Sequence, residues 1–238
     1  TRGYSYVLQD MKLLRQSIET FILSVNDKDM PPEAYIFEWD RPKVYSSAWD
    51  GSPNLIHAVY TYVAKTGDRA FYQQHRPTLL RLGQWIASLD GDGDGLPDPA
   101  NDRYPFGYYD SVTNGVRHTY ALAKFYAAYQ ELAELEEFAD QPGQTWRLRA
   151  STLRAAFHDP AHGYWPAGQT WPVAWFRADG PPVTILETFG VFEALRSGLI
   201  APEDGAHYSA LMRTLHARLP ELLDGPTPLR LAVGGYPA

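Results

Sequence analysis

The stretch NGVRHTYALAKFYAAYQELAELE, residues 114–136, decides the fold of this chain. From Tyr120 to Tyr129 it is apolar on nearly every side of a helix, not only along one stripe. A helix that is apolar all round lies among other helices and has no solvent-facing side. The stretch therefore predicts a central helix over 114–136 in an all-α domain.

Six further segments carry apolar residues at the 3.6-residue spacing of a helix that is buried on one side. They cover residues 5–25, 54–66, 69–89, 144–157, 183–198 and 203–223. The connections alternate between tight turns and loops of about 25 residues, although loops beyond about 12–15 residues are uncommon unless they have a function. A hairpin repeat of this kind is typical of an α/α toroid or solenoid, with its binding end at the long loops.

The order of long and short connections also predicts two layers of helices. The second, fourth and sixth helices follow long loops and form the inner ring, and the other four form the outer ring. A closed barrel of six hairpins has twelve helices, whereas seven are expected here. We therefore expect one toroid domain over residues 1–238 that forms an open arc or a fragment, completed by further chain or by oligomerisation.

The overall charge and composition limit the classes of partner. A net charge of -7 and a pI near 5.5 argue against nucleic acid and anionic membranes, which attract basic surfaces. The chain has no cysteine, so disulfides and thiolate chemistry are excluded. No segment resembles a membrane span or a signal peptide, and the sequence leaves the compartment open.

Several stretches resemble the six-hairpin glycosidases, the (α/α)6-barrel glycoside hydrolases that include trehalases, processing glucosidases, the glucosidase part of glycogen-debranching enzymes and α-rhamnosidases. These stretches are SSAWDGSPNLIHAVYTYVAKTGD at 46–68, DGDGDGLPD at 90–98, GYYDSVTNGVRHTYALAKFYAAYQELAEL at 107–135 and TILETFGVFEALRSGL at 184–199. The resemblance implies an (α/α)6-type toroid and hydrolysis of a glycoside. It is a similarity of pattern over most of the chain and not a single diagnostic motif.

The resemblance also implies a general acid, because related enzymes carry it in an aromatic-Asp-(x)-Ser segment before an inner helix. Tyr109-Asp110-Ser111 matches this pattern before the helix at 114, and Trp49-Asp50-Gly51-Ser52 matches it before the helix at 54. Asp110 is our first candidate and Asp50 the second. An adjacent aromatic ring that excludes water raises a carboxyl pKa, as a general acid requires. The alternative for each aspartate is a helix cap or a loop brace.

Two further carboxylates are catalytic candidates, because glycoside hydrolysis uses a pair of carboxyl groups. Glu33 lies in the first long loop, and Glu187 lies near the start of the helix at 183–198. A plain role in the helix or at its dipole is the alternative for Glu187.

Aromatic and polar residues of the long loops and of the central helix are candidates for sugar binding, because rigid rings offer contact area at little entropic cost. They are Trp39, Trp49, Tyr108, Tyr109, Arg117, His118, Trp165, Trp171 and Trp175. A structural hydrogen-bonding role is the alternative for Arg117 and His118.

The stretch DGDGDGLPD at 90–98 matches the first half of a calcium-binding loop. The ligands would be Asp90, Asp92, Asp94, the carbonyl of Leu96, and Asp98. The bidentate glutamate of an EF-hand is replaced by Asn101. A structural Ca²⁺ ion and a solvated Asp-Gly turn are both open.

The sequence thus predicts a glycoside hydrolase that acts on an oligosaccharide or glycoside without an organic cofactor. One alternative is a non-catalytic carbohydrate-binding or scaffolding domain. Another is a polysaccharide lyase or glycoside phosphorylase on the same toroid, although acidic loops disfavour the anionic sugars that lyases cleave.

Overall fold

The structure is a computed structural model that describes residues 10–25, 35–38, 41–44, 49–98, 117–177, 179–223 and 232–233. The predicted all-α class is confirmed, with seven α-helices in these ranges. They are α2 (Met11–Ile22), α3 (Gly51–Thr66), α4 (Arg69–Ser88), α5 (Thr119–Phe138), α6 (Gln144–His158), α7 (Thr188–Ser197) and α8 (Ala206–Leu223). None of these helices is long and apolar enough to cross a membrane.

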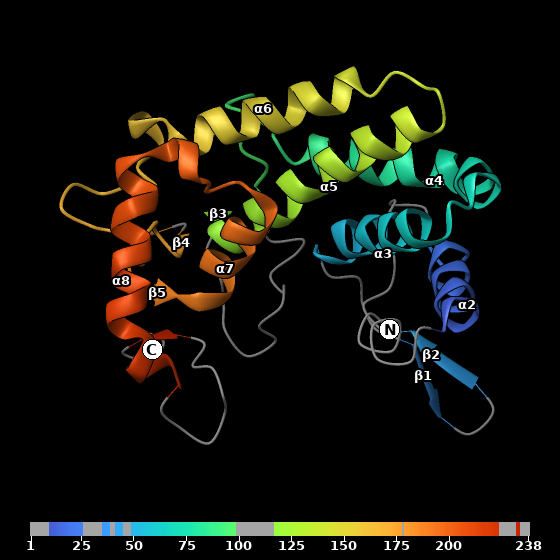
Figure 1. The fold of residues 1–238 in the computed structure, drawn as a ribbon, viewed down its shortest axis with the longest axis horizontal. Coiled ribbons are helices and arrows are strands. Elements are labelled where there is room, and N and C mark those ends of the chain that lie inside the picture. Colours follow the sequence, from blue (N-terminus) through green and yellow to red (C-terminus); the bar gives the residue numbers. More distant parts are fainter. Residues whose placement is uncertain are drawn as a thin grey trace.

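The helices form an arc of antiparallel pairs in two layers (Figure 1). Helix α5 packs against α3 on one side and α7 on the other, which makes these three the inner row. Helices α2, α4 and α6 pack on the outside of this row. The predicted division into inner and outer helices therefore agrees with the observed packing for these six helices, whereas α8 contacts η2 (Pro202–Asp204) and β6 (Ala232–Val233).

Helix α5 is buried on nearly all sides, as its composition predicts, and its buried acidic residues have partners. Glu136 accepts hydrogen bonds from Tyr72 Oη at 2.6 Å and from Arg76 Nε and Nη2 at 2.7 Å each. Burial alone would raise the pKa of Glu136, but the bonds from Arg76 and Tyr72 lower it below its ordinary value. The outer helix α4 therefore supplies the charge that lets an ionised glutamate stand inside the core.

Two inner helices begin later than the sequence predicts. Helix α5 starts at Thr119 and not at 114, and α7 starts at Thr188 and not at 183. The preceding residues form short strands, β3 (Arg117–His118) and β5 (Leu186–Glu187). Their backbone groups bond to distant segments, which apolar periodicity cannot reveal.

Short antiparallel pairs occupy the long-loop end of the arc. Strand β3 pairs with β4 (Trp175–Phe176), and β5 pairs with β6 (Ala232–Val233). In the first long loop β1 (Tyr35–Glu38) pairs with β2 (Arg41–Val44). In the third long loop, which follows α6, an antiparallel bridge joins Trp175 to Val183.

The tight turns at the opposite end are fixed by side chains. Gly67 takes a left-handed φ of 67°, and Asp68 caps α4 by accepting a 3.0 Å hydrogen bond from the backbone N–H of Phe71. Two short 3₁₀ helices, η1 (Pro160–His162) and η2 (Pro202–Asp204), follow α6 and α7.

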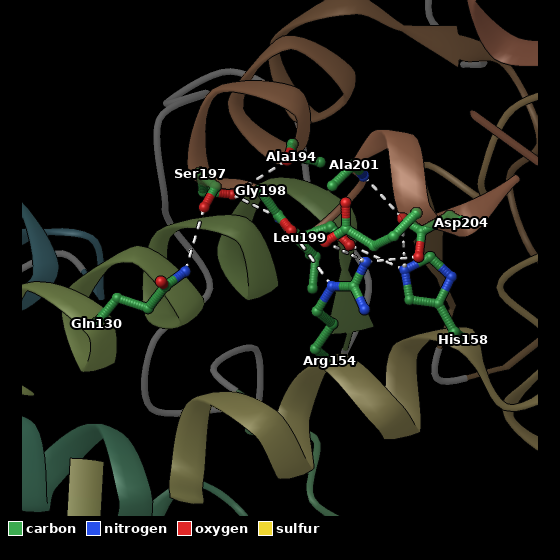
Figure 2. Close-up of polar contacts among 10 residues, drawn as sticks. Gln130, Arg154, His158, Ala194, Ser197, Gly198, Leu199, Ala201 and Asp204 are labelled. Carbon is green, nitrogen blue, oxygen red and sulfur yellow. Dashed lines mark hydrogen bonds and ion pairs between the residues drawn. The ribbon is translucent and has the colours of Figure 1, made fainter. Parts of the chain in front are cut away.

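The turn between α7 and α8 is tied to α6, as Figure 2 shows. Arg154 contacts Asp204 Oδ1 at 2.5 Å and the carbonyl of Gly198 at 3.3 Å. His158 Nε2 lies 2.8 Å from the carbonyl oxygen of Leu199. Asp204 also accepts a hydrogen bond from the backbone N–H of Ala201 at 2.7 Å. The carboxylate of Asp204 therefore holds the backbone of the turn and contacts Arg154 of α6 at the same time.

The turn between α5 and α6 allows a direct test of how closely these two helices pack. A Cβ atom on Gly143 would lie 2.6 Å from the carbonyl oxygen of Ala133 in α5. We predict that Gly143→Ala lowers the free energy of unfolding by about 1–3 kcal/mol, because a backbone atom must move. Urea denaturation followed by circular dichroism measures this change.

Gly91→Ala is the matched control, because a Cβ on Gly91 meets nothing within 4 Å. Equal stabilities for the two alanine variants would contradict the close approach of α6 to α5.

Candidate active site

The N-termini of the three inner helices lie together at the long-loop end. Asp50, His118 and Glu187 occupy the N-cap positions of α3, α5 and α7. The Trp49 ring lies 4.7 Å from the ring of His118 and 5.7 Å from that of Tyr120, which joins the starts of α3 and α5. Gly190 in α7 packs against the backbone N of Tyr120, where an added Cβ would stand 3.1 Å away. Two candidate carboxylates and one candidate imidazole therefore border the same region.

Asp50 is partly exposed and does not cap its helix through its side chain. The cap role weighed for it is wrong for a physical reason. Its backbone is already helical, with φ -82° and ψ -6°, whereas a capping side chain reaches back from an extended residue.

Glu187 is fixed by the backbone of its own helix. It is 4% exposed, and its carboxylate accepts hydrogen bonds from the N–H groups of Phe189 at 2.8 Å and Gly190 at 2.5 Å. Glycine at 190 makes this possible, since a Cβ there would lie 2.5 Å from Glu187 Oε2. The role at the helix terminus considered for Glu187 is therefore present, and it holds a carboxylate in one orientation beside the positive end of α7.

His118 and Trp49 are buried side by side in this region. Trp49 is 1% exposed and meets His118, Tyr120 and Phe125 edge to face, so its ring belongs to the core. His118 Nε2 is buried without a hydrogen-bond partner among the described residues. Burial lowers the pKa of His118 to about 3, which makes the imidazole neutral at neutral pH.

The side chain of Arg117 contacts the loop at 90–98. Its guanidinium contacts Asp92 at 3.1 Å, Asp94 at 2.8 Å and Asp98 at 2.5 Å. Burial alone would lower the pKa of Arg117, but Asp98 and Asp94 raise it above its ordinary value.

Three of the five proposed calcium ligands come together in the structure. Carboxylate oxygens of Asp90, Asp92 and Asp94 lie within 4.8 Å of one another. Asp98 joins the same group through Arg117, and the side chain of Leu96 lies in the core. The loop therefore gathers oxygen donors that suit Ca²⁺, but it also holds a side-chain cation among them.

The three tryptophans of the third long loop differ in their surroundings. Trp175 is buried with Ala174 and Val183. Trp171 is half-buried and donates a 2.8 Å bond from Nε1 to the carbonyl of Thr184. The ring of Trp165 is stacked with two histidine rings, that of His158 at 5.9 Å and that of His207 at 4.4 Å.

The remaining predicted residues lie outside the described ranges, and their roles stay predictions. They are Asp110, Glu33, Trp39, Tyr108 and Tyr109.

An ionic pair joins α5 to α7 and was not predicted from the sequence. Lys124 Nζ lies 3.0 Å from Glu193 and 5.6 Å from the centre of the Tyr120 ring. Burial alone would raise the pKa of Glu193, but Arg196 and Lys124 lower it to about 2. The available signal was Lys124 itself, the one charged residue between Tyr120 and Tyr129 in a helix that is otherwise apolar there.

The fold matches solved glycosidases at low sequence identity. A rhamnosidase from Klebsiella oxytoca with rhamnose bound aligns with a TM-score of 0.68 and 16% identity, over 88% of this chain and 38% of that chain. A GH78 family rhamnosidase of Bacillus sp. aligns with a TM-score of 0.68 and 15% identity, over 87% of this chain and 20% of that chain. A GH63 mannosylglycerate hydrolase from Thermus thermophilus aligns with a TM-score of 0.69 and 13% identity, over 96% of this chain and 73% of that chain.

No protein-family model and no curated protein matches the sequence. The chain spans about a fifth to two fifths of the two rhamnosidases. It therefore has the α/α toroid fold of these six-hairpin glycosidases, at identities that establish the fold alone.

The buried His118 predicts a specific dependence of stability on pH. The folded pKa of about 3 is below the unfolded value of about 6.5, so the unfolded chain binds the proton first and stability falls as the pH drops below 6.5. Between pH 7 and pH 5 this group alone should remove about 2 kcal/mol of unfolding free energy. We predict that His118→Phe, which keeps a ring against Trp49, loses this part of the slope.

Chemical denaturation at pH 7 and pH 5 measures the slope for each protein. The low pKa of Glu193 changes stability only at lower pH, between its ordinary pKa of 4.5 and about 2. The matched control is His216→Phe, which changes an exposed histidine of α8. An unchanged slope in His118→Phe would contradict the burial of a neutral imidazole.

Proposed function

We propose that this chain is a glycoside hydrolase, or the part of one that carries catalytic carboxylates. The observation that supports the proposal most directly is the meeting of Asp50, His118 and Glu187 at the N-termini of three inner helices, in a toroid shared with glycosidases. The substrate would be an oligosaccharide or glycoside bound at the long-loop end.

The two carboxylates of a glycosidase need opposite protonation states, and the surroundings suggest an assignment. Two backbone N–H groups and the positive end of α7 favour the ionised form of Glu187, which suits a base. The acid would be Asp110, by the resemblance of its segment, with Asp50 as the second choice and Glu33 as a further carboxylate. The acid would protonate the glycosidic oxygen while the base takes a proton from the attacking water.

Sugar contact would come from rings with an accessible face. Trp171 is half-buried beside this end of the arc and is the described tryptophan best suited to stacking. Trp39, Tyr108 and Tyr109 are proposed for the same role from the sequence. Trp49 and Trp175 would instead support the site from within the core.

The central test compares the chain with its Asp110→Asn variant on defined glycosides. Two of the structural neighbours are a rhamnosidase and a mannosylglycerate hydrolase, so the panel should include aryl α-rhamnosides, mannosylglycerate and aryl α-glucosides. We predict that Asp110→Asn lowers kcat by about 100-fold or more with sugar binding retained, because an amide cannot deliver the proton. Released aglycone measures turnover, and calorimetry measures binding.

Asp140→Asn is the matched control, since Asp140 is exposed at the opposite, short-turn end and pairs with Arg69. It should turn over as the unaltered chain does. Full activity of Asp110→Asn would rule out Asp110 as the acid, and Asp50→Asn would then be the decisive variant. Sugar binding without any turnover by the unaltered chain would favour a non-catalytic carbohydrate-binding domain.

A further inference from the structure

The acidic loop at 90–98 uses one oxygen of each of three aspartates to shape its own backbone. Asp90 Oδ2 accepts from the N–H of Gly95 at 3.1 Å, and Asp94 Oδ1 accepts from the N–H of Leu96 at 2.9 Å. Asp92 Oδ1 faces the N–H of Asp94 at 3.4 Å. The second oxygen of each carboxylate takes no part in these backbone contacts.

In two of the three cases the second oxygen faces Arg117. Nη2 lies 3.1 Å from Asp92 Oδ2, and Nη1 lies 2.8 Å from Asp94 Oδ2. The remaining guanidinium nitrogen, Nε, lies 2.5 Å from Asp98 Oδ1. Each guanidinium nitrogen therefore meets a different carboxylate, which a planar, permanently charged fork can do and a lysine cannot.

We propose that Arg117 is the resident cation of the loop at 90–98 and is a positioning residue for the start of α5. The loop does not need a metal ion while this side chain is in place. A Ca²⁺ ion would require the same oxygens of Asp92 and Asp94 that the guanidinium contacts, so ion and arginine compete for one position. The proposal concerns the loop itself and holds whether or not the chain hydrolyses glycosides.

The ion pairs of Arg117 connect two parts of the fold, because of where Arg117 lies in the chain. Asp98 follows α4 at the outer side, and Arg117 is the first residue of β3, which leads into α5. The ion pairs therefore fasten the end of an outer helix to the start of an inner one, across residues 99–116. Strand β3 is also paired with β4, so His118 is held from two directions next to the candidate site.

Burial decides which of these contacts matter most. Asp92 is 60% exposed in its side chain, and a pair with it is screened by solvent. Arg117, Asp94 and Asp98 are only 20%, 21% and 32% exposed, so their contacts form the main part of the clamp. His162 Nδ1 lies 3.5 Å from Asp94 Oδ2. Asp90 Oδ1 is the remaining inward oxygen and is buried without a partner among the described residues.

The first test measures binding of Ca²⁺ to the unaltered chain and to Arg117→Met. Removing the guanidinium leaves Asp90, Asp92, Asp94 and Asp98 without their cation, which should convert the loop into a metal site. We expect the melting temperature of Arg117→Met to fall by roughly 5 °C in chelator and to recover at least half of this loss in millimolar Ca²⁺. The unaltered chain should melt at the same temperature in chelator and in Ca²⁺.

Calorimetry with Ca²⁺ and luminescence of Tb³⁺ report the binding directly. The matched control is Arg147→Met, which removes an arginine from an exposed pair with Glu137 and should show neither the loss nor the recovery. Recovery by a metal ion distinguishes replacement of a cation from a general loss of packing.

The measurement on the unaltered chain decides the proposal even if Arg117→Met does not fold. Tight binding of Ca²⁺ by that chain, or a lower melting temperature in chelator, would overturn it and assign the loop to calcium. Asp92→Asn gives a further check, because it leaves Arg117 its two less exposed partners. Its melting temperature should stay near that of the unaltered chain and stay insensitive to Ca²⁺.

Discussion

The burial of α5 on almost every side is the constraint on which the rest of the structure depends. A helix in that position cannot leave its polar groups to solvent, so each needs a partner from a neighbouring helix. Glu136 finds Arg76 and Tyr72 of α4, Glu131 finds His57 of α3, and Lys124 finds Glu193 of α7. These pairs fix the rotation of α5 relative to its neighbours more specifically than apolar contacts do.

Helix periodicity was sufficient to predict the helices, and the order of long and short connections was sufficient to place α3, α5 and α7 in one row with α2, α4 and α6 outside it. Asp68 and Gly67 act locally, through backbone angles and a hydrogen bond to Phe71, and such effects can be read along the chain. The starts of α5 and α7 could not be predicted in the same way. Strand β3 pairs with β4, which lies more than fifty residues further along the chain. This pairing keeps Arg117 and His118 extended, so α5 begins only after them.

The candidate site was predictable in position but not in orientation. Residues before the inner helices do gather at one end, because hairpins of similar length return the chain there. A ring can contact a ligand only if its neighbours leave it uncovered, and the sequence does not show which residues become neighbours in space. Trp49, for example, is enclosed by His118, Tyr120 and Phe125. Arg117 was likewise predicted to bind substrate from its position before the inner helix. In the structure it contacts three aspartates from earlier in the chain.

The meeting of three helix N-termini limits how acid and base can be arranged there. Each terminus presents partial positive charge, which favours carboxylates in their ionised form. In the proposed function Glu187 would be the base, because it accepts two backbone bonds from its own helix. A general acid in the same region needs a carboxyl group that such bonds do not stabilise as an anion. Asp50 does not accept a capping hydrogen bond from α3, because its own backbone is already helical.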